Sequence, residues 1–393
     1  MWKPSRTKSI KFDLDELKIR GQKDIVALGA ELKANFCIIK KNKAYLYYGF
    51  GDLKDPRCWE RFRAAVLQKI KRFKIKPAVI SCDLNPQFLS SQFAQELKLR
   101  FKSAKRLLPV QHHYAHIAGA QAALALSRKK IIGVACDGTG LGDNKNVWGC
   151  EFLLCDHFRI RRIGHLNYIP LPGADMAVRQ PWRVAIALLY KLYGKEIFTL
   201  PIEWLKKKKA KTKVLIKMID KGINTPLASS AGRLFDAVAA LTGLCHDVKY
   251  EAEAAIALER KAGKLRGREK SSYPFSIREE NGLLIARTDM MIKAIVEDIR
   301  CGNRVEVVAA RFHNTFSRII IKMCGKIKDK FNIRDVVLGG GVFFNKIITD
   351  SLMRGLERSG FFVHKPKDCI LSDEGLSLGQ AVIAYVSGRT GKN

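Results

Sequence analysis

Two histidines are spaced so that both can bind one metal ion. His112 and His116 lie four residues apart in the segment VQHHYAHIAG, which has the pattern of a helix start. Residues i and i+4 of a helix share a face, so the two imidazoles point the same way, and this geometry suits a divalent cation. The pair taken alone is equally consistent with packing in a core. His113 falls on another face, and we expect a structural or supporting role for it.

Two aspartates could complete such a site. Asp137 ends the strand-like segment GVACDG and is followed by Gly138, Gly140 and Gly142. An acid at the end of a strand, beside glycines that let the backbone approach a ligand, is typical of a turn that holds phosphate or metal. An isolated Asp-Gly pair is better explained as a hairpin turn. Asp373 in ILSDEGLSLGQ is by itself better explained as a helix N-cap.

Two further segments have features of turns that bind anions. DVVLGGGVFFN (335–345) combines a strand, three glycines and a helix start, whose free N–H groups suit an anionic ligand or a nucleotide. In SSAGRLFDAVAAL (229–241), Ser230 and Gly232 precede a helix that carries Asp236, although an ordinary cap beside an exposed acid explains this pattern equally well. The chain has no GxGxxG fingerprint and no P-loop motif. No GxSxG or Cys–His pattern indicates a covalent nucleophile.

The elements that must position these residues alternate in two successive α/β units. Residues 1–22 are predicted to form a tail or linker. Residues 23–130 form a first unit that ends with the helix of the histidine pair, and residues 131–393 form a second unit. A mostly helical insertion is expected at about 176–265 in this second unit. The arrangement predicts a two-lobed α/β fold with its ligand in the cleft between the lobes.

The composition restricts the class of protein. A chain of 393 residues that is 47% hydrophobic can form two packed units. The ten cysteines include no CxxC pair, so a cysteine-rich structural zinc site is not supported. No apolar stretch approaches the roughly 20 residues of a membrane span, and the N-terminus has no signal-like apolar region, so we expect a cytoplasmic protein without a membrane anchor.

The net charge of +34 is unusual, and basic runs occur at 206–213 and 260–270. Nucleic-acid binding, a lysine-rich solvated surface and an acidic protein partner would each explain it. Neither run contains the aromatic residues that stack on bases. We therefore favour a solvated surface or partner docking, and we predict that both runs lie away from the metal cleft.

Taken together, the segments resemble one family. LGAELKANFCII, CDLNPQFLSSQFA, VQHHYAHIAGA, DGTGLGD, SSAGRLFDAVAALTG, LGGGVFFN and SDEGLSLGQA occur in the order found in the carbamoyltransferase domain of the hydrogenase-maturation HypF family. The likeness runs from about residue 24 to 386. It implies the actin-like or sugar-kinase-like ATPase fold.

The resemblance also implies the site residues. His112, His116, Asp137 and Asp373 match the family's ligands for iron or zinc. Asp236 matches an acid that binds ribose, while Ser230, Gly232, Gly340, Gly341 and Asn345 match the nucleotide-binding turns. Lys33, in LGAELK, is predicted to approach the phosphate or carbamoyl group and is the candidate catalytic residue.

The chain departs from the family pattern at three positions near these turns. Glu253 stands in YEAEAA where the family has YEGQAA, Gly339 replaces a serine, and Phe344 replaces a glutamine. These changes leave the expected metal ligands intact and alter the surroundings of the nucleotide.

The implied reaction moves a carbamoyl group from ATP-derived carbamoyl adenylate to the C-terminal cysteine thiol of a HypE-like partner, where it becomes a cyanide ligand of [NiFe]-hydrogenase. The family's acylphosphatase, zinc-finger and YrdC-like regions find no match here, so we expect a separate YrdC-like protein to supply the adenylate. A tRNA threonylcarbamoyl transferase and a non-catalytic nucleotide-binding subunit are the alternatives.

Overall fold

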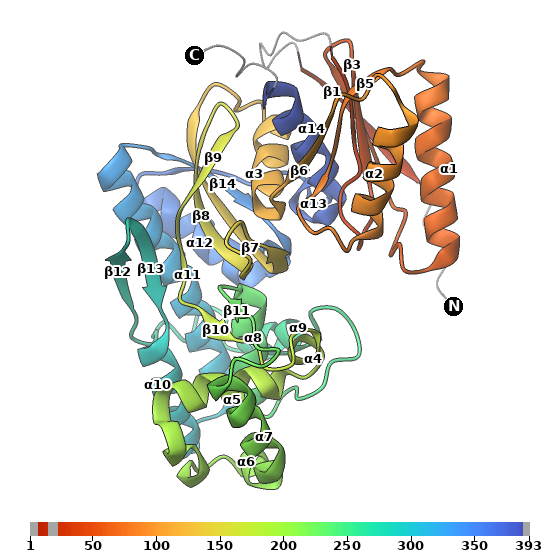
Figure 1. The fold of residues 1–393 in the computed structure, drawn as a ribbon. Coiled ribbons are helices and arrows are strands. Elements are labelled where there is room, and N and C mark those ends of the chain that lie inside the picture. Colours follow the sequence, from red (N-terminus) through yellow and green to blue (C-terminus); the bar gives the residue numbers. More distant parts are fainter. Residues whose placement is uncertain (1–6, 15–22, 388–393) are drawn as a thin grey trace.

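A computed structural model describes residues 7–14 and 23–387 of the chain. The fold is built on two β-sheets that lie side by side, with helices around them (Figure 1). Within the described ranges, no helix is long and apolar enough to span a bilayer.

The first sheet has six strands in the order β1-β4-β3-β2-β5-β6. The strands β1 to β4 pair antiparallel, whereas β5 and β6 continue the sheet parallel to β2. The bounds are β1 (Lys8–Asp13), β2 (Asp24–Ala27), β3 (Phe36–Lys40), β4 (Lys43–Tyr48), β5 (Pro77–Asp83) and β6 (Arg106–Val110). Both faces of the central strands are covered, which explains their continuous apolar sequences.

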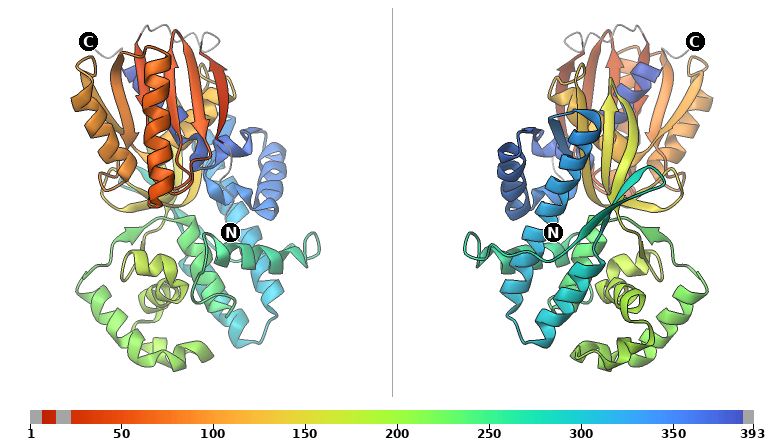
Figure 2. Two further views of the ribbon diagram at one scale, coloured as in Figure 1. Left: turned by 90° about the vertical axis from the view of Figure 1, so that its right-hand side faces the viewer. Right: turned by 90° about the vertical axis from the view of Figure 1, so that its left-hand side faces the viewer.

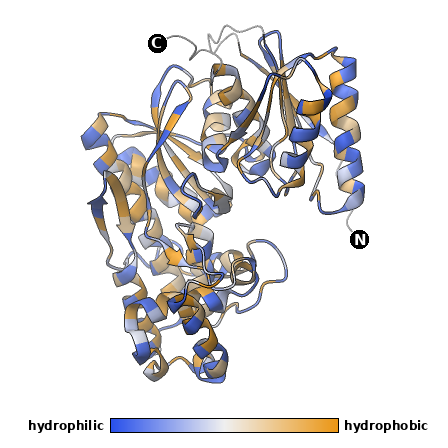
Figure 3. Cartoon of the chain, in the orientation of Figure 1, coloured by the Kyte–Doolittle hydropathy of each residue, from blue (hydrophilic) through white to orange (hydrophobic). Residues whose placement is uncertain are grey.

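Helices cover the first sheet on both faces. The helices α1 (Pro56–Arg72) and α2 (Leu89–Arg100) pack on one face through side chains such as Phe62 and Phe93. The helix α1 begins as its sequence predicts, because the Asp55 side chain accepts a hydrogen bond from the Arg57 N–H at the N-cap. Its apolar and polar residues alternate along the helix surface (Figure 3). The helices α3 (His112–Ala123) and α14 (Leu376–Ser387) cover the other face.

Two boundaries differ from the prediction. The expected tail at 1–22 contains β1, because Lys8–Asp13 pairs along its whole length with β4 and extends the sheet edge; residues 1–6 and 15–22 lie outside the described part. The C-terminal helix α14, expected in the second lobe, packs instead against α3 and the strands β2, β3 and β5 of the first lobe. Its apolar sequence reflects this burial between elements of the first lobe rather than a place in the second lobe.

The second sheet follows the order β12-β13-β9-β8-β7-β14-β15, with a short pair, β10 and β11, beside β8. The bounds are β7 (Lys130–Leu141), β8 (Val147–Asp156), β9 (Arg159–Leu166), β10 (Ile169–Pro170), β11 (Leu227–Ala228), β12 (Ser276–Glu280), β13 (Leu283–Arg287), β14 (Asp335–Gly339) and β15 (Phe362–His364). The hairpin β12–β13 was not predicted, although Asn281-Gly282 between two strands is a strong hairpin signal.

Helices extend the second lobe away from the first sheet (Figure 2). The expected insertion contains α4 (Asp175–Arg179), α5 (Pro181–Tyr193), α6 (Glu203–Lys207), α7 (Lys209–Asp220), α8 (Ala231–Leu241) and α9 (Glu253–Gly263), with a 3-10 turn η1 (Gly194–Thr199). The later helices are α10 (Asp289–Arg300), α11 (Val305–Phe331), α12 (Lys346–Arg358) and α13 (Asp368–Leu371), with 3-10 turns η2 (Gly341–Phe344) and η3 (Asp373–Gly375). A large apolar cluster around Phe235, Phe312 and Phe316 joins this region to the sheet.

The two basic runs have different positions. The first run, 206–213, lies on α6 and α7 at the end of the molecule farthest from the first sheet (Figure 1). The second run begins in α9, whose residue Glu259 lines the central cavity described below. The position of 206–213 agrees with the prediction that the runs lie away from the cleft, whereas the run 260–270 contributes no residue to the cavity wall but starts directly after Glu259, which does.

Candidate active site

The four predicted metal ligands lie together between the two sheets. One ligand atom from each of His112, His116, Asp137 and Asp373 can be chosen so that all four atoms are within 4.8 Å of one another. His116 Nε2 lies 3.1 Å from Asp137 Oδ2 and 3.3 Å from Asp373 Oδ1. His112 Nε2 lies 3.6 Å and 3.8 Å from the same two oxygens. Two imidazoles thus face two carboxylates across one small space.

Local structure explains why residues so far apart in sequence meet here. The helix α3 starts directly after β6, and its first turns place both histidines on one face. Asp137 lies on β7, and Asp373 opens the η3 turn just before α14. The helices α3 and α14 approach very closely at Gly379, where a Cβ atom would lie only 1.8 Å from the Ala115 carbonyl oxygen. This close packing holds the start of α14 beside α3.

A third aspartate orients the first histidine. Asp83, at the end of β5, lies with Oδ2 2.8 Å from His112 Nδ1, and both side chains are almost completely buried. His112 Nε2 then faces Asp137 and Asp373 with no hydrogen-bond partner in the structure. A histidine bonded to a carboxylate through one nitrogen, with the other free, is the usual state of a metal-binding imidazole.

The electrostatics of the cluster favour a bound cation. Although burial disfavours an imidazolium, the nearby carboxylates of Asp137, Asp373 and Asp83 hold the pKa of His112 well above its usual value. Burial likewise opposes ionisation of Asp137, yet His112 and His116 hold its pKa well below the usual range. The two facing acids therefore require positive charge, and the donor set of two nitrogens and two oxygens fits iron or zinc. The residues present fit the implied metal.

Tight backbone contacts surround Asp137. Gly340 has φ of +99°, and a Cβ there would lie 2.3 Å from the Cys136 carbonyl oxygen, so only glycine fits. At Gly232 a Cβ would come within 2.9 Å of Gly138 Cα, so the N-terminus of α8 packs directly on the turn after Asp137. Ser230 caps α8 by accepting a hydrogen bond from the Arg233 N–H, and its hydroxyl bonds to the Gly138 carbonyl oxygen.

A buried ion pair between Arg162 and Glu151 stabilises the segments around the turn after Asp137. Glu151 is fully buried and accepts hydrogen bonds from Arg162 and from the Ser229 hydroxyl, each at 2.6 Å. The Gly149 N–H also donates to Glu151 at 3.0 Å. The pair thus connects β8 and β9 with the residue before Ser230, which in turn contacts the turn at Asp137. These contacts fix the position of the second lobe's part of the site.

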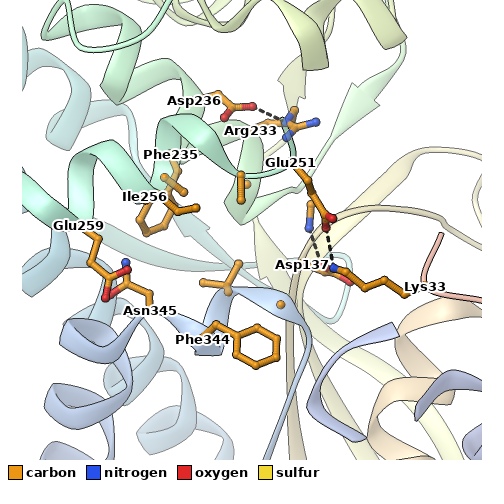
Figure 4. Close-up of a pocket in the computed structure, with 16 residues that line it drawn as sticks. Lys33, Asp137, Arg233, Phe235, Asp236, Glu251, Ile256, Glu259, Phe344 and Asn345 are labelled. Atoms are coloured by element: carbon orange, nitrogen blue, oxygen red, sulfur yellow. Dashed lines mark hydrogen bonds and ion pairs between the residues drawn. The ribbon is translucent and has the colours of Figure 1, made fainter. Parts of the chain in front are cut away.

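A cavity of about 410 Å³ lies beside Asp137, one of the four clustered residues (Figure 4). This volume is in the range of small-ligand sites. Its lining is contributed by both lobes and includes Lys33, Asp137, Gly138, Gly232, Arg233, Phe235, Asp236, Glu251, Ala252, Ala255, Ile256, Glu259, Gly341, Val342, Phe344 and Asn345. Asp137 therefore belongs both to the ligand cluster and to the cavity wall.

The two ends of the cavity differ in chemistry. Asp137 and Lys33 lie at one end, whereas Asp236 and Arg233 lie at another (Figure 4). Asp236 Oδ2 is 2.8 Å from Arg233 Nε, and both side chains are nearly buried. Burial raises the pKa of Asp236 to about 6, against the opposing effect of Arg233. A buried acid with unused acceptor capacity suits the hydroxyl groups of a sugar.

Asn345 is held in place by its neighbours. Its Oδ1 accepts a hydrogen bond from the Ile348 N–H and so caps α12. Its Nδ2 donates to His313 Nε2 at 3.0 Å, and the pKa of buried His313 is lowered to about 4, which keeps that nitrogen an acceptor. Because both contacts fix the amide, Asn345 presents a rigid polar edge to the cavity.

Not every predicted binding residue reaches the cavity. Gly232, Asp236, Gly341, Asn345 and Lys33 line it, whereas Ser230 and Gly340 do not. These two residues shape the turns behind the wall, Ser230 as a cap and Gly340 through close packing.

The sequence analysis missed several residues of the site. Asp83 could have been predicted from the sequence, because it ends the strand-like segment PAVISCD just as Asp137 ends GVACD. Glu251 and Glu259 also line the cavity; Glu251 lies in the YEAEAA segment, in which only Glu253 was singled out. Of the residues that depart from the family pattern, Phe344 lines the cavity and Glu253 does not.

Comparisons with known proteins agree with this picture. Residues 20–123 match the model described as the HypF Kae1-like domain. Residues 133–380 match the model described as the carbamoyltransferase, Kae1-like domain, second subdomain.

Relatives are similar over nearly the whole chain. Carbamoyltransferase HypF of Synechocystis is 32% identical over 94% of this chain and 48% of its own length. The carbamoyltransferase HypF homolog of Cupriavidus necator is 33% identical over 92% of this chain and 91% of its own length. The chain spans about half the length of most of the curated relatives it matches.

Solved structures show the same fold. A full-length HypF in its phosphate- and nucleotide-bound form superposes with a TM-score of 0.85 at 33% identity, over 95% of this chain and 57% of its own. HypF from T. kodakarensis gives 0.84 at 29% identity, over 96% and 50% of the two chains.

The fold and the matched models together place the protein among the Kae1-like carbamoyltransferase domains, and the predicted two-lobed α/β architecture is confirmed. Within that class, the chain belongs to the carbamoyltransferase HypF family.

Proposed function

We propose that this protein transfers the carbamoyl group of carbamoyl adenylate to the C-terminal cysteine thiol of a HypE-like acceptor during [NiFe]-hydrogenase maturation. The observation that carries the proposal is the double position of Asp137, which joins the candidate metal ligands to the wall of the nucleotide-sized cavity. A nucleotide in this cavity would place its phosphate end beside the cluster. The HypF neighbour that was solved with phosphate and nucleotide bound supports such a ligand.

Each part of the cavity has a task in this proposal. Asp236 accepts hydrogen bonds from the ribose, and Asn345 and Gly341 contact the nucleotide from the side of α12. The N–H groups at the N-terminus of α8 near Gly232 face the phosphate, where glycine allows close backbone approach. Enclosure between the lobes keeps the reactive mixed anhydride away from bulk water.

The metal would be iron or zinc, held by His112, His116, Asp137 and Asp373. When bound, it supplies a Lewis acid and a template for the phosphate and carbamoyl oxygens. The protein's own task is to hold these ligands in one orientation, which Asp83 does for His112 through the 2.8 Å contact.

The proposed reaction balances without a further reactant. The acceptor sulfur forms a bond to the carbamoyl carbon, and the bond between that carbon and the phosphate oxygen breaks. The products are the S-carbamoyl cysteine and AMP, and the thiol proton is released. The nucleophile comes from the acceptor, which agrees with the absence of a nucleophile motif in the sequence. A YrdC-like protein supplies the carbamoyl adenylate in this scheme.

A competition assay tests the choice of acceptor. Carbamoyl adenylate and, in a parallel reaction, threonylcarbamoyl adenylate, each labelled in the carbamoyl carbon, are incubated with the protein, a HypE-like protein and tRNA at equal concentrations. We expect the label in the HypE-like protein and none after its terminal cysteine is changed to serine. Label in tRNA from threonylcarbamoyl adenylate would favour the threonylcarbamoyl transferase alternative, and label in neither acceptor from either donor would favour a non-catalytic subunit.

A further inference from the structure

An ion pair between the two lobes lies at the edge of the cavity. Lys33 comes from the loop between β2 and β3 of the first lobe, and Glu251 comes from the segment between α8 and α9 of the second. Lys33 Nζ lies 2.8 Å from Glu251 Oε1, and both residues line the cavity together with Asp137 (Figure 4). Through this pair, the two lobes present opposite charges at the edge of the cavity, where a molecule would enter.

The pair is easily opened. The side chains of Lys33 and Glu251 are 39% and 64% exposed, and exposed ion pairs contribute little to stability. An incoming anion can therefore replace Glu251 at Lys33 with little cost. Although burial lowers the pKa of Lys33, the acids Asp373, Glu251 and Asp137 raise it overall, so the ammonium stays charged at neutral pH. Lys33 is thus a permanent cation within the field of two metal ligands.

One exposed apolar side chain lines the cavity, and two others neighbour the ion pair in sequence. Phe344 lines the cavity and is 45% exposed, while Leu32 and Tyr250 are 46% and 52% exposed and directly precede Lys33 and Glu251 in sequence. An exposed aromatic side chain beside a charged group can contact the chain of a bound polypeptide. The opening therefore combines a displaceable cation with apolar surface, which suits a polypeptide end that carries a carboxylate.

We infer, on the basis of the proposed function, that Lys33 binds the terminal α-carboxylate of the acceptor protein after Glu251 releases it. The residues before the acceptor's last cysteine would contact the apolar surface of Leu32, Tyr250 and Phe344. In a C-terminal cysteine the thiol and the α-carboxylate belong to one residue. Fixing the carboxylate at Lys33 therefore directs the sulfur toward the Asp137 end of the cavity and selects a cysteine at the end of a chain. Lys33 then acts as a specificity residue, whereas the family resemblance predicted that it approaches the phosphate or the carbamoyl group.

The test compares two forms of one acceptor. A HypE-like protein is prepared by peptide ligation with either its free terminal carboxylate or a terminal amide, and both are offered with saturating carbamoyl adenylate. Wild type is compared with Lys33→Met, which keeps the length of the side chain and removes the charge. Lys330→Met is the matched control. Lys330 forms a similar exposed ion pair, with its Nζ 2.6 Å from Glu279 Oε1, and neither residue lines the cavity. The affinity of each variant for AMP is measured in parallel.

We expect the amide to raise the KM of the acceptor about tenfold with wild type and with Lys330→Met, the lower range for a charge-assisted contact. With Lys33→Met, both acceptors should show this raised KM, and AMP affinity should not change. Such non-additivity identifies the carboxylate and Lys33 as direct partners. Glu251→Gln should lower the KM of the carboxylate form, because Lys33 no longer has a competing anion.

Other outcomes separate the inference from the proposed function. Equal KM values for the two acceptors with wild type would overturn the inference and leave carbamoyl transfer standing. A Lys33→Met variant that loses AMP affinity but still distinguishes the two acceptors would assign Lys33 to the nucleotide instead. Transfer to neither acceptor by wild type would remove the proposed function, and the inference with it.

Discussion

The contact between Asp83 and His112 allows a precise test of the candidate metal site. The change Asp83→Asn keeps the shape of the side chain and an oxygen that can accept from His112 Nδ1, but it removes the negative charge. The same oxygen cannot also accept from the Asn85 N–H, which donates to Asp83 Oδ1, so this one part-buried contact is lost. We still expect the fold to persist while the imidazole becomes a weaker ligand.

The loss of metal affinity expected for Asp83→Asn is about the same by two routes. The side chains of His112 and Asp83 are 4% and 1% exposed, so solvent does not screen their 2.8 Å contact. A hydrogen bond to a charged group contributes about 1.5–3 kcal/mol. Removal of a carboxylate behind a metal-binding histidine typically lowers metal affinity about 10- to 100-fold. Because a tenfold change corresponds to about 1.4 kcal/mol, both routes predict a loss of roughly one to two decades in affinity.

The assay is a competition for zinc between the protein and a coloured chelator. Asp335→Asn is the matched control, since Asp335 Oδ1 lies 2.8 Å from His364 Nε2 at the start of β14, at the end of that strand away from the cluster. We expect the control to bind zinc as wild type does. A dissociation constant for Asp83→Asn equal to that of wild type, with an unchanged melting temperature, would refute the assignment of Asp83 as the group that orients His112.

Three further predictions follow from the site and the surface. The double variant His112→Ala, His116→Ala should lose the approximately one equivalent of iron or zinc found in wild type by elemental analysis, and unchanged occupancy would place the metal elsewhere. Adenosine, which has no titratable phosphate, should bind more tightly as the pH rises through about 6. The reason is that the pKa of Asp236 is raised to about 6 and its ionised form is the better acceptor for ribose. Calorimetry from pH 5 to 8 should show this rise in affinity, and Asp236→Asn should bind adenosine weakly at every pH. Serine replacements of the exposed lysines in 206–213 should leave carbamoyl transfer unchanged and weaken RNA binding only in its salt-dependent, sequence-independent part, so a strong preference for one tRNA in a filter-binding assay would contradict us.

The four residues of the candidate metal cluster were predicted from the family resemblance, and part of their geometry is encoded locally. A helical i, i+4 spacing fixes His112 relative to His116, and acids at the end of a strand or the start of a helix, such as Asp137 and Asp373, have backbone-defined positions. The order of the motifs then indicated which of these residues meet. The two-lobed α/β architecture followed from the alternation of strands and helices in the same way.

Other features depend on contacts that no local pattern contains. The pairing of β1 with β4 and the docking of α14 on the first lobe are long-range choices, settled by which apolar faces meet. Glu251 reaches Lys33 across 218 positions of sequence, so neither residue indicates the other. Ser230 was assigned to the nucleotide because it lies in a matching motif, yet its hydroxyl is used in capping and in the turn at Asp137. The hairpin β12–β13 is different, since its Asn-Gly turn was visible in the sequence.

The central claim is that this site transfers a carbamoyl group to a terminal thiol, and the mass of the acceptor tests it most directly. A HypE-like protein is incubated with carbamoyl adenylate and either wild type or Asp137→Asn, and its C-terminal peptide is then analysed by mass spectrometry. Our account predicts one carbamoyl group on the terminal cysteine with wild type, released AMP in equal amount, and at most a trace with Asp137→Asn, which disturbs the cluster and the cavity together. An unmodified cysteine with metal-loaded wild type, or equal modification by the variant, would contradict it.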